Sequence, residues 1–320
     1  MGNKTKNAKQ LFVKTVILIL LACLLGFIIL IKTFRTPEPG VHLVSSASEE
    51  MKSSDGLVTE LSVKHNPYMQ SIDFSTFPTE SARTPSLYDD KLLASAEHVY
   101  YGVYFFKDDS FCSTENSEPT PSASVIKVFI MDFVYSLIEE NQLSHDTTIQ
   151  GQAVRTLVNA MIQHSDNNAT NTLIKEFGMN TLNEYFASQG YSDTTLERLM
   201  LDYDAMAQGL NNYTSLDDTL LFLKTVYENK DTFPYCEMLE ILKGQTVKTK
   251  IPALLPEGVV AANKTGEINN VQNDIGLVFS ECGDFAVVIL TNGCANASQT
   301  IDAIADFALQ AYTFEANSCE

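Results

Sequence analysis

Basic residues are scarce in this chain of 320 residues, and tryptophan is absent. Lysine and arginine number 21 against 40 aspartate and glutamate residues, which gives a formal net charge of -19. A charge of this sign repels anionic polymers, so nucleic acid is excluded as the main partner. The acidic residues themselves indicate a solvated surface. At this length the chain forms one large domain or two small ones.

Several patterns of reactive residues are also missing. The five histidines form no His-x-x-x-His pair, and the cysteines form no Cys-x-x-Cys pair, so we expect neither a metal site nor another cofactor. The Gly-x-Ser-x-Gly pattern is absent, which argues against a Ser-His-Asp hydrolase. No internal repeat is present.

Only one long apolar run is present, from Thr15 to Ile31, and four lysines precede it. About 17 residues is near the lower limit for crossing a bilayer, and lysines mark the cytoplasmic end of such a helix. A cleaved signal peptide or a lipoprotein signal ending at Cys23 fits less well, because apolar residues continue beyond Cys23. We therefore predict a cytoplasmic tail (1–14), a transmembrane anchor (15–34), an extracytoplasmic stalk (35–85) and an outer domain at the cell membrane (86–320).

The six cysteines do not form a simple disulfide framework. Cys23 lies in the apolar run, which leaves an odd number outside it. Cys282 and Cys294 flank an expected strand of about eight residues, which at roughly 3.3 Å per residue separates them by about 25 Å. This distance excludes a bond between them. Other pairings stay open, and at least one free thiol is expected.

Three short motifs with reactive side chains follow one another along the chain. Taken singly, each has a structural explanation, as a helix N-cap, a polar turn or the end of a strand. Together, and in this order, they are the elements that serine-lysine acyl-transfer enzymes use. The motifs are Ser124-Val-Ile-Lys127, Ser165-Asp166-Asn167 and Lys264-Thr265-Gly266.

The first motif predicts a nucleophile and its base. A serine hydroxyl at neutral pH needs a neighbouring base to take its proton. Lys127 lies three residues after Ser124, on the same face of an expected helix, and acts as that base if its pKa is lowered. The charge of Lys264 would supply part of the lowering. The amide N–H groups of Ser124 and Glu267 form the candidate oxyanion hole.

The other two motifs predict proton relay and substrate binding. Ser165 would pass a proton to the leaving nitrogen, and Asn167 would hold Lys127 and a substrate amide. The predicted substrate-binding residues on the strand are Lys264, Thr265 and Gly266. Of these, Lys264 and Thr265 would bind a substrate carboxylate.

The local sequence supports these placements. Residues 125–138 are apolar on nearly every side, which predicts a central helix. Residues 259–264, 275–280 and 284–291 read as three strands, the last two joined by a turn at 281–283. Lys264 would then lie on an antiparallel sheet that faces the serine helix.

From about Ser86 to the C-terminus the chain resembles the class A β-lactamase branch of the penicillin-recognising serine enzymes. The resemblance rests on the three motifs, on Asn273-Asp274, and on an opening helix (87–96), an opening strand (99–107) and a closing helix (298–312). It implies an α/β (α+β) fold with two halves, one an antiparallel sheet flanked by helices and the other all-helical. The active site would lie between them. The implied chemistry is an acyl-enzyme on Ser124, formed with β-lactams or peptidoglycan peptides.

The chain also departs from that family. A family glutamate, in the loop after the second motif, activates the water that releases the acyl group, and alignment of the loop puts Met200 there. Methionine cannot accept a proton. Asp202 and Asp204 are candidates for a displaced base. The stretch between Lys127 and Ser165 is shorter than in typical class A enzymes, which would open the cleft to a bulkier substrate.

Three functions stay open on this evidence. The first is hydrolysis or capture of β-lactams or D-alanyl peptides. The second is a binding or sensing module, for which only the 14 residues before the apolar run would be cytoplasmic. The third is a pseudoenzyme, which the intact motifs argue against.

Overall fold

The computed structural model describes residues 87–114 and 118–319. The predicted tail, anchor and stalk lie outside these residues. Within the described ranges no helix is long and apolar enough to cross a membrane.

One antiparallel sheet of five strands organises the described residues, in the order β2-β1-β9-β8-β7. The first strand therefore pairs with the last, in the register Tyr101 to Ile289. Nearly every residue of β8 and β9 is buried, because helices cover both faces of the sheet. The strands are β1 (His98–Phe105), β2 (Ser110–Ser113), β7 (Val260–Ile268), β8 (Val271–Phe279) and β9 (Phe285–Asn292).

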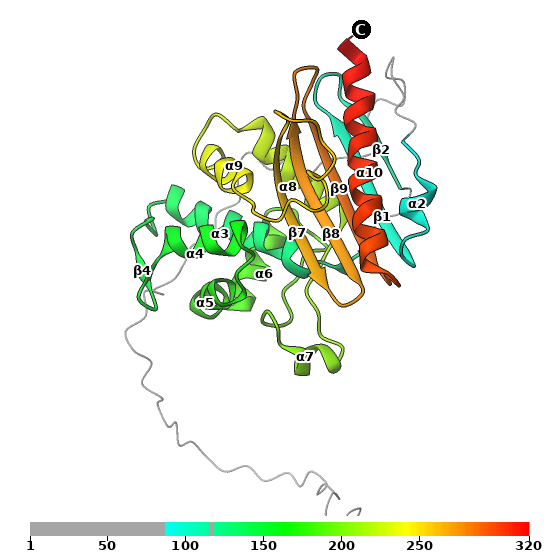
Figure 1. The fold of residues 1–320 in the computed structure, drawn as a ribbon. Coiled ribbons are helices and arrows are strands. Elements are labelled where there is room, and N and C mark those ends of the chain that lie inside the picture. The colour runs from blue at the N-terminus through cyan, green and yellow to red at the C-terminus, as the bar shows by residue number, and fades with distance from the viewer. Residues whose placement is uncertain (1–86, 115–117, 320) are drawn as a thin grey trace, which may run out of the picture. The chain divides into compact units, whose positions relative to one another are not determined.

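Different helices cover the two faces of the sheet (Figure 1). The long helix α10 (Ala297–Ala316) and the short α2 (Asp90–Leu93) cover one face, where Phe105, Phe285 and Phe307 share an apolar cluster. Helix α8 (Leu216–Glu228) covers the other. A β-carbon at Gly102 would lie 2.9 Å from the Leu216 side chain, so this glycine lets α8 pack directly on β1.

The helical half surrounds the segment after Ser124. A 3-10 turn, η2 (Ala123–Ile126), leads into α3 (Lys127–Glu139), which is buried on nearly every side. The predicted central helix is confirmed, although it begins with this tighter turn. The helices around it are α4 (Val154–Gln163), α5 (Asn167–Phe177), α6 (Met179–Ser188) and α9 (Tyr235–Lys243).

Short elements complete the described fold. The expected opening helix is only four residues long in α2, because Asp89 caps its start and Ser95 bonds back to Leu92 at its end. The remaining elements are β3 (Thr120–Pro121), which pairs with β6 (Tyr213–Thr214); β4 (Thr148–Ile149), which pairs with β5 (Gln152–Ala153); α7 (Tyr203–Ala207); and η3 (Asn317–Cys319).

One disulfide joins Cys282, in the turn between β8 and β9, to Cys319 in η3, the short turn that follows α10. The free thiols among the described cysteines are Cys112, Cys236 and Cys294. The exclusion of a Cys282–Cys294 bond is therefore confirmed, and so is the expected free thiol. Sequence spacing could not identify Cys319 as the partner, because the turn and the helix end meet only in the folded chain.

We expect Cys319→Ser to lower the free energy of unfolding by about 3 to 4 kcal/mol. The bond closes a loop with a sequence separation of 37, and a loop of that size removes about this much entropy from the unfolded chain. Denaturant unfolding without reductant measures the change. Cys236→Ser, at a free thiol, is the control and should change the value by less than about 1 kcal/mol. Equal stability of Cys319→Ser and the unaltered chain would contradict the prediction.

Candidate active site

Ser124 lies in the 3-10 turn between β3 and α3 and is half-buried. The preceding Ala123 has a φ of 47°, a left-handed conformation that costs a non-glycine residue energy and is typical of functional sites. Within the described ranges, the Ser124 hydroxyl makes no side-chain hydrogen bond. This hydroxyl is therefore not held by another side chain of the described residues.

Strand β7 approaches the serine turn through Gly266. A β-carbon at this position would lie 2.7 Å from the Ser122 carbonyl oxygen and 3.2 Å from the Ser124 nitrogen. No larger residue fits without moving the turn or the strand. The last residue of the third motif thus has a packing role that the sequence did not reveal, and it lets β7 lie against the backbone of the serine turn.

Lys127 is fully buried, and its ammonium nitrogen is held by the second motif. Its Nζ donates to the Ser165 carbonyl oxygen at 2.7 Å, to Asn167 Oδ1 at 2.8 Å and to Ser165 Oγ at 3.3 Å. Burial lowers the pKa of Lys127 to about 7, and the nearby Asp166 charge opposes the shift. At neutral pH a large fraction of this lysine is therefore an unprotonated amine, the form that accepts a proton.

Lys264 reaches the same serine from the sheet. Its Nζ donates to Ser165 Oγ at 3.0 Å and to the Thr265 carbonyl oxygen at 2.8 Å. Complete burial, followed by the charge of Lys127, lowers the pKa of Lys264 well below its usual value. Two lysines from different halves of the fold therefore share one hydroxyl group.

Ser165 and its neighbours also form a helix start. Ser165 has a φ of 54°, and the Asp166 side chain accepts from the Ala169 amide as the N-cap of α5. Asp166 therefore has a structural role, as a helix cap. The other two residues of this motif, Ser165 and Asn167, contact Lys127. His164 at the end of α4 is exposed, with Nδ1 3.5 Å from Thr246 Oγ1.

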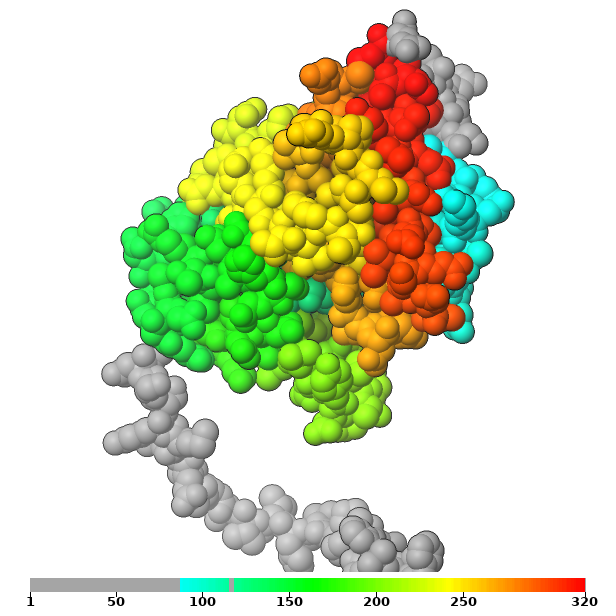
Figure 2. Space-filling view, viewed as in Figure 1, coloured from blue at the N-terminus to red at the C-terminus, as the bar shows by residue number. Residues whose placement is uncertain are grey.

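A hollow gives access to this region of the surface. In Figure 2 a small teal area, the colour of the segment that contains η2, is visible between the green helical half and the yellow and orange segments. Part of the segment around η2 is therefore visible at the surface between these elements.

Asn273, on β8, fixes the backbone just before Ser124. Its amide nitrogen donates to the Pro121 carbonyl oxygen at 2.9 Å and to the Ser122 carbonyl oxygen at 3.3 Å. Its side-chain oxygen accepts from the Thr291 amide at 2.8 Å. Three consecutive polar residues, Gln272 to Asp274, in a buried strand were the available sequence signal, and they gave no role for Asn273.

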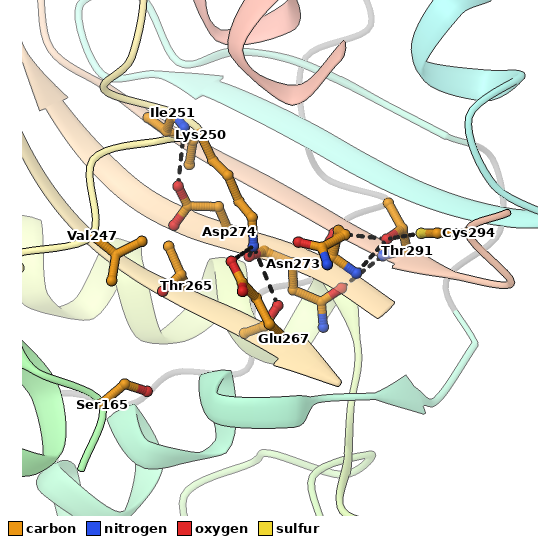
Figure 3. Close-up of polar contacts among 12 residues, drawn as sticks. Ser165, Val247, Lys250, Ile251, Thr265, Glu267, Asn273, Asp274, Thr291 and Cys294 are labelled. Atoms are coloured by element: carbon orange, nitrogen blue, oxygen red, sulfur yellow. Dashed lines mark hydrogen bonds and ion pairs between the residues drawn. The ribbon is translucent and has the colours of Figure 1, made fainter. Parts of the chain in front are cut away.

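Asp274 and Lys250 are two further buried charged residues that sequence analysis did not assign to the site (Figure 3). The Asp274 carboxylate accepts from the Ile251 amide at 3.0 Å and from the Asn263 side chain at 3.0 and 3.2 Å. Burial raises the pKa of Asp274 to about 6, although the positive charge of Lys250 opposes the rise.

The loop from residue 196 to residue 212 is closed at its base by paired backbone bonds between Thr195 and Tyr213. Asparagine side chains then hold it along its length. Asn183 bonds both backbone groups of Leu196, and Asn212 accepts from the amides of residues 197 and 198. The buried Arg198 donates to Asn211, which fits a bracing role.

Met200 lies in this loop next to the site. Asn171 accepts from the Met200 amide at 2.8 Å and donates to its carbonyl oxygen at 3.1 Å. Asn171 comes four residues after Asn167 on α5, so both lie on the same helix face, and Asn167 binds Lys127. The backbone of Met200 is therefore attached to the helix that carries Asn167.

The two alternative bases are placed differently. The Asp202 carboxylate accepts from the Ala205 amide as the N-cap of α7. Asp204 is exposed in the first turn of that helix. Neither side chain has a bond to Lys127, Ser165 or Lys264 within the part of the chain that the structure describes.

Comparisons with known proteins agree with this geometry. A family model described as "Beta-lactamase enzyme family" matches residues 90–314. A β-lactamase from Bacillus licheniformis is 26% identical over 159 residues, which cover 48% of this chain and 52% of that protein. The match thus spans about half the length of this curated relative.

Solved structures with the same fold cover most of the described residues. The β-lactamase of Sphaerobacter thermophilus DSM 20745 has a TM-score of 0.62 at 22% identity, covering 71% of this chain and 94% of that one. PBP-A has a TM-score of 0.62 at 20% identity with the same coverage. An ancestral class A β-lactamase has a TM-score of 0.63 at 19% identity, covering 70% and 96%.

The solved structures establish an α/β β-lactamase-like fold with an antiparallel sheet and helices, as predicted. The family match extends over well more than half of the sequence and includes all three motifs. This chain therefore belongs to the class A-like β-lactamase enzyme family.

Proposed function

We propose that this protein is a serine acyl-transfer enzyme that forms an ester on Ser124 with β-lactams or with the D-alanyl peptides that they mimic. The observation that carries the proposal is the convergence of two buried lysines, Lys127 and Lys264, on the Ser165 hydroxyl. Burying two like charges around one hydroxyl costs stability, and it favours loss of a proton from one of them. A base beside a free serine hydroxyl is what acyl transfer requires.

Acylation then proceeds through a series of proton transfers among Ser124, Lys127 and Ser165. Unprotonated Lys127 takes the proton of Ser124, whose oxygen attacks the amide carbonyl of the substrate. The carbonyl becomes an oxyanion, which accepts hydrogen bonds from the Ser124 and Glu267 amides. When the C–N bond breaks, Ser165 gives its proton to the leaving nitrogen and recovers one from Lys127 or Lys264. The products are an ester on Ser124 and a free amine.

The third motif supplies the anchor for the leaving group. A substrate carboxylate at Lys264 and Thr265 would favour the ammonium form of Lys264, because an opposite charge stabilises it. Substrate binding would therefore set the protonation states of the two lysines as well as hold the substrate in place.

Release of the acyl group is the slow step in this proposal. Met200 is 7% exposed and offers no proton acceptor, Asp202 caps α7 and Asp204 is exposed. A structurally similar protein, a point mutant of PBP-A, is described as an acyl-enzyme complex with penicillin G, which supports a long-lived adduct of this kind. The same observations favour, as a second candidate, a penicillin- or wall-peptide-binding module that does not hydrolyse its ligand.

The domain would act outside the cytoplasm at the cell membrane. The lysine-flanked apolar run at 15–31 supports an anchor with a cytoplasmic N-terminus. The Cys282–Cys319 disulfide supports an oxidising compartment for the domain.

A fluorescent penicillin should label the peptide that contains Ser124. Both Ser124→Ala and Lys127→Ala should abolish the adduct, because one removes the nucleophile and the other its base. Ser122→Ala, which removes a neighbouring hydroxyl, is the matched control and should keep it. Gel fluorescence and peptide mass spectrometry measure the adduct. Labelling that survives Ser124→Ala would refute the mechanism.

The acylation rate should rise with pH and level off above about pH 7. Burial lowers the pKa of Lys127 to about 7, so the reactive amine is lost as pH falls through that value. Below it the rate should drop about tenfold per pH unit, in proportion to the unprotonated fraction. Stopped-flow measurement of acylation from pH 5 to 9 checks this. A rate independent of pH over this range would mean that Lys127 is not the base.

The adduct on Ser124 should persist for minutes or longer, and Met200→Glu should accelerate its release. General-base assistance is worth about 10² to 10⁴ in rate. Asp202→Asn and Asp204→Asn should change release by less than about threefold, since neither carboxylate is the base. Intact-protein mass spectrometry over time follows the adduct. Rapid release that is lost in either asparagine variant would instead identify a displaced base and a working β-lactamase.

Protease added to intact protoplasts should release the domain by cutting within residues 36–85. This result follows from an anchor at 15–34 and a stalk on the outer side. Immunoblotting of the medium detects the fragment, and a cytoplasmic protein is the control for cell integrity. Complete protection of the domain would show that the predicted topology is wrong.

A further inference from the structure

Lys250 is a buried lysine that the proposed mechanism does not use. It lies in the segment between α9 and β7, and its side chain is 0% exposed. Figure 3 shows it extending along the sheet toward Glu267 and Asn273. A lysine ammonium in this position must find partners for three N–H donors.

Three oxygens lie within reach of the ammonium group. Lys250 Nζ is 2.9 Å from Glu267 Oε1, 3.0 Å from the Asn273 carbonyl oxygen and 3.4 Å from the Gly266 carbonyl oxygen. The Glu267 carboxylate is 48% exposed, so the ion pair is solvated on one side only. The two carbonyl oxygens are the contacts that connect Lys250 to the active site.

The contact with Gly266 acts on the oxyanion hole directly. The Gly266 carbonyl and the Glu267 N–H belong to one peptide unit and point in opposite directions. Gly266 pairs with Asn273, and β7 is the edge strand of the sheet, so this carbonyl faces β8 and the Glu267 N–H faces away from it. A positive charge at the carbonyl oxygen polarises the unit and makes its N–H a stronger donor.

The contact with Asn273 reaches the other oxyanion donor. The Asn273 backbone carbonyl binds Lys250, and its side chain donates to the Pro121 and Ser122 carbonyl oxygens, just before Ser124. Lys250 thus contacts the peptide unit of the Glu267 N–H directly, through the Gly266 carbonyl oxygen. It reaches the backbone before the Ser124 N–H indirectly, through Asn273.

We propose that Lys250 is a positioning residue that orients and polarises the oxyanion hole through the Gly266 and Asn273 carbonyl groups. The inference rests on the proposed acyl transfer for its catalytic consequence. The effect of Lys250 on the Glu267 N–H, which it fixes and makes a stronger donor, exists in the protein without substrate. The proposed role of Lys250 and the proposed acyl transfer can therefore be refuted separately.

Lys248 provides a matched control. It lies in the same segment and bonds the same strand, since its Nζ is 3.4 Å from both the Ala261 carbonyl oxygen and Asn263 Oδ1. These contacts lie several residues from Glu267. If the two lysines merely attach this segment to β7, Lys248→Met and Lys250→Met should behave alike.

The first test uses the full-length chain without substrate. The NMR resonance of the Glu267 amide proton should move upfield in Lys250→Met and stay in place in Lys248→Met. If Lys250→Met does not fold, Lys250→Gln, which keeps a donor but no charge, should show a smaller upfield shift. An unchanged resonance overturns the proposal, whether or not Ser124 forms an adduct.

The second test measures acylation by a fluorescent penicillin. Loss of a whole oxyanion donor costs about 10² to 10³ in rate, and here the donor remains, so Lys250→Met should lower the acylation rate constant by about 10- to 100-fold. The dissociation constant of the non-covalent complex should change by less than about threefold. Lys250→Arg should restore most of the rate, because it keeps the charge.

Wild-type acylation in Lys250→Met overturns the proposal. Absence of any adduct in the unaltered chain would refute the proposed function alone, since the amide resonance still tests Lys250.

Discussion

The sharing of the Ser165 hydroxyl by two buried lysines is the interaction on which the site depends. Lys127 comes from α3 and Lys264 from β7, so the contact exists only when the helical half and the sheet are packed together. Burial lowers the pKa of both amines, and the charge of Lys127 lowers the pKa of Lys264 further. The chemistry of the site is thus a consequence of how its two halves meet.

Other features keep these halves at the correct distance. Gly266 lets β7 touch the serine turn, and Asn273 reaches across to hold the same turn by its carbonyl groups. The left-handed conformations of Ala123 and Ser165 cost energy that this surrounding packing must supply. A loose interface would let both residues relax, and the lysines would become ordinary solvated cations.

Much of this arrangement could be predicted from the sequence, because local signals carry it. The spacing of Ser124 and Lys127 predicts a nucleophile and its base, and alternating or continuous apolar runs identify the central helix and the last strands. Strand ends shifted by a few residues, since β7 and β8 extend into polar positions that pair across the sheet. Contacts between distant residues could not be predicted. Lys250 and the asparagines that hold the 196–212 loop have no local pattern, and their roles follow from the folded geometry alone.

The pairing of β1 with β9 has a consequence for the order in which the domain assembles. His98 aligns with Asn292, about 190 residues later in the chain, so the sheet has one of the longest-range contacts that a domain of this size permits. During synthesis the helical segments can associate early, but β1 has no neighbour on this edge until the last strand emerges. Lys264 also arrives late. The two amines around Ser165 therefore come together only after the helical segments and β7 have both been made.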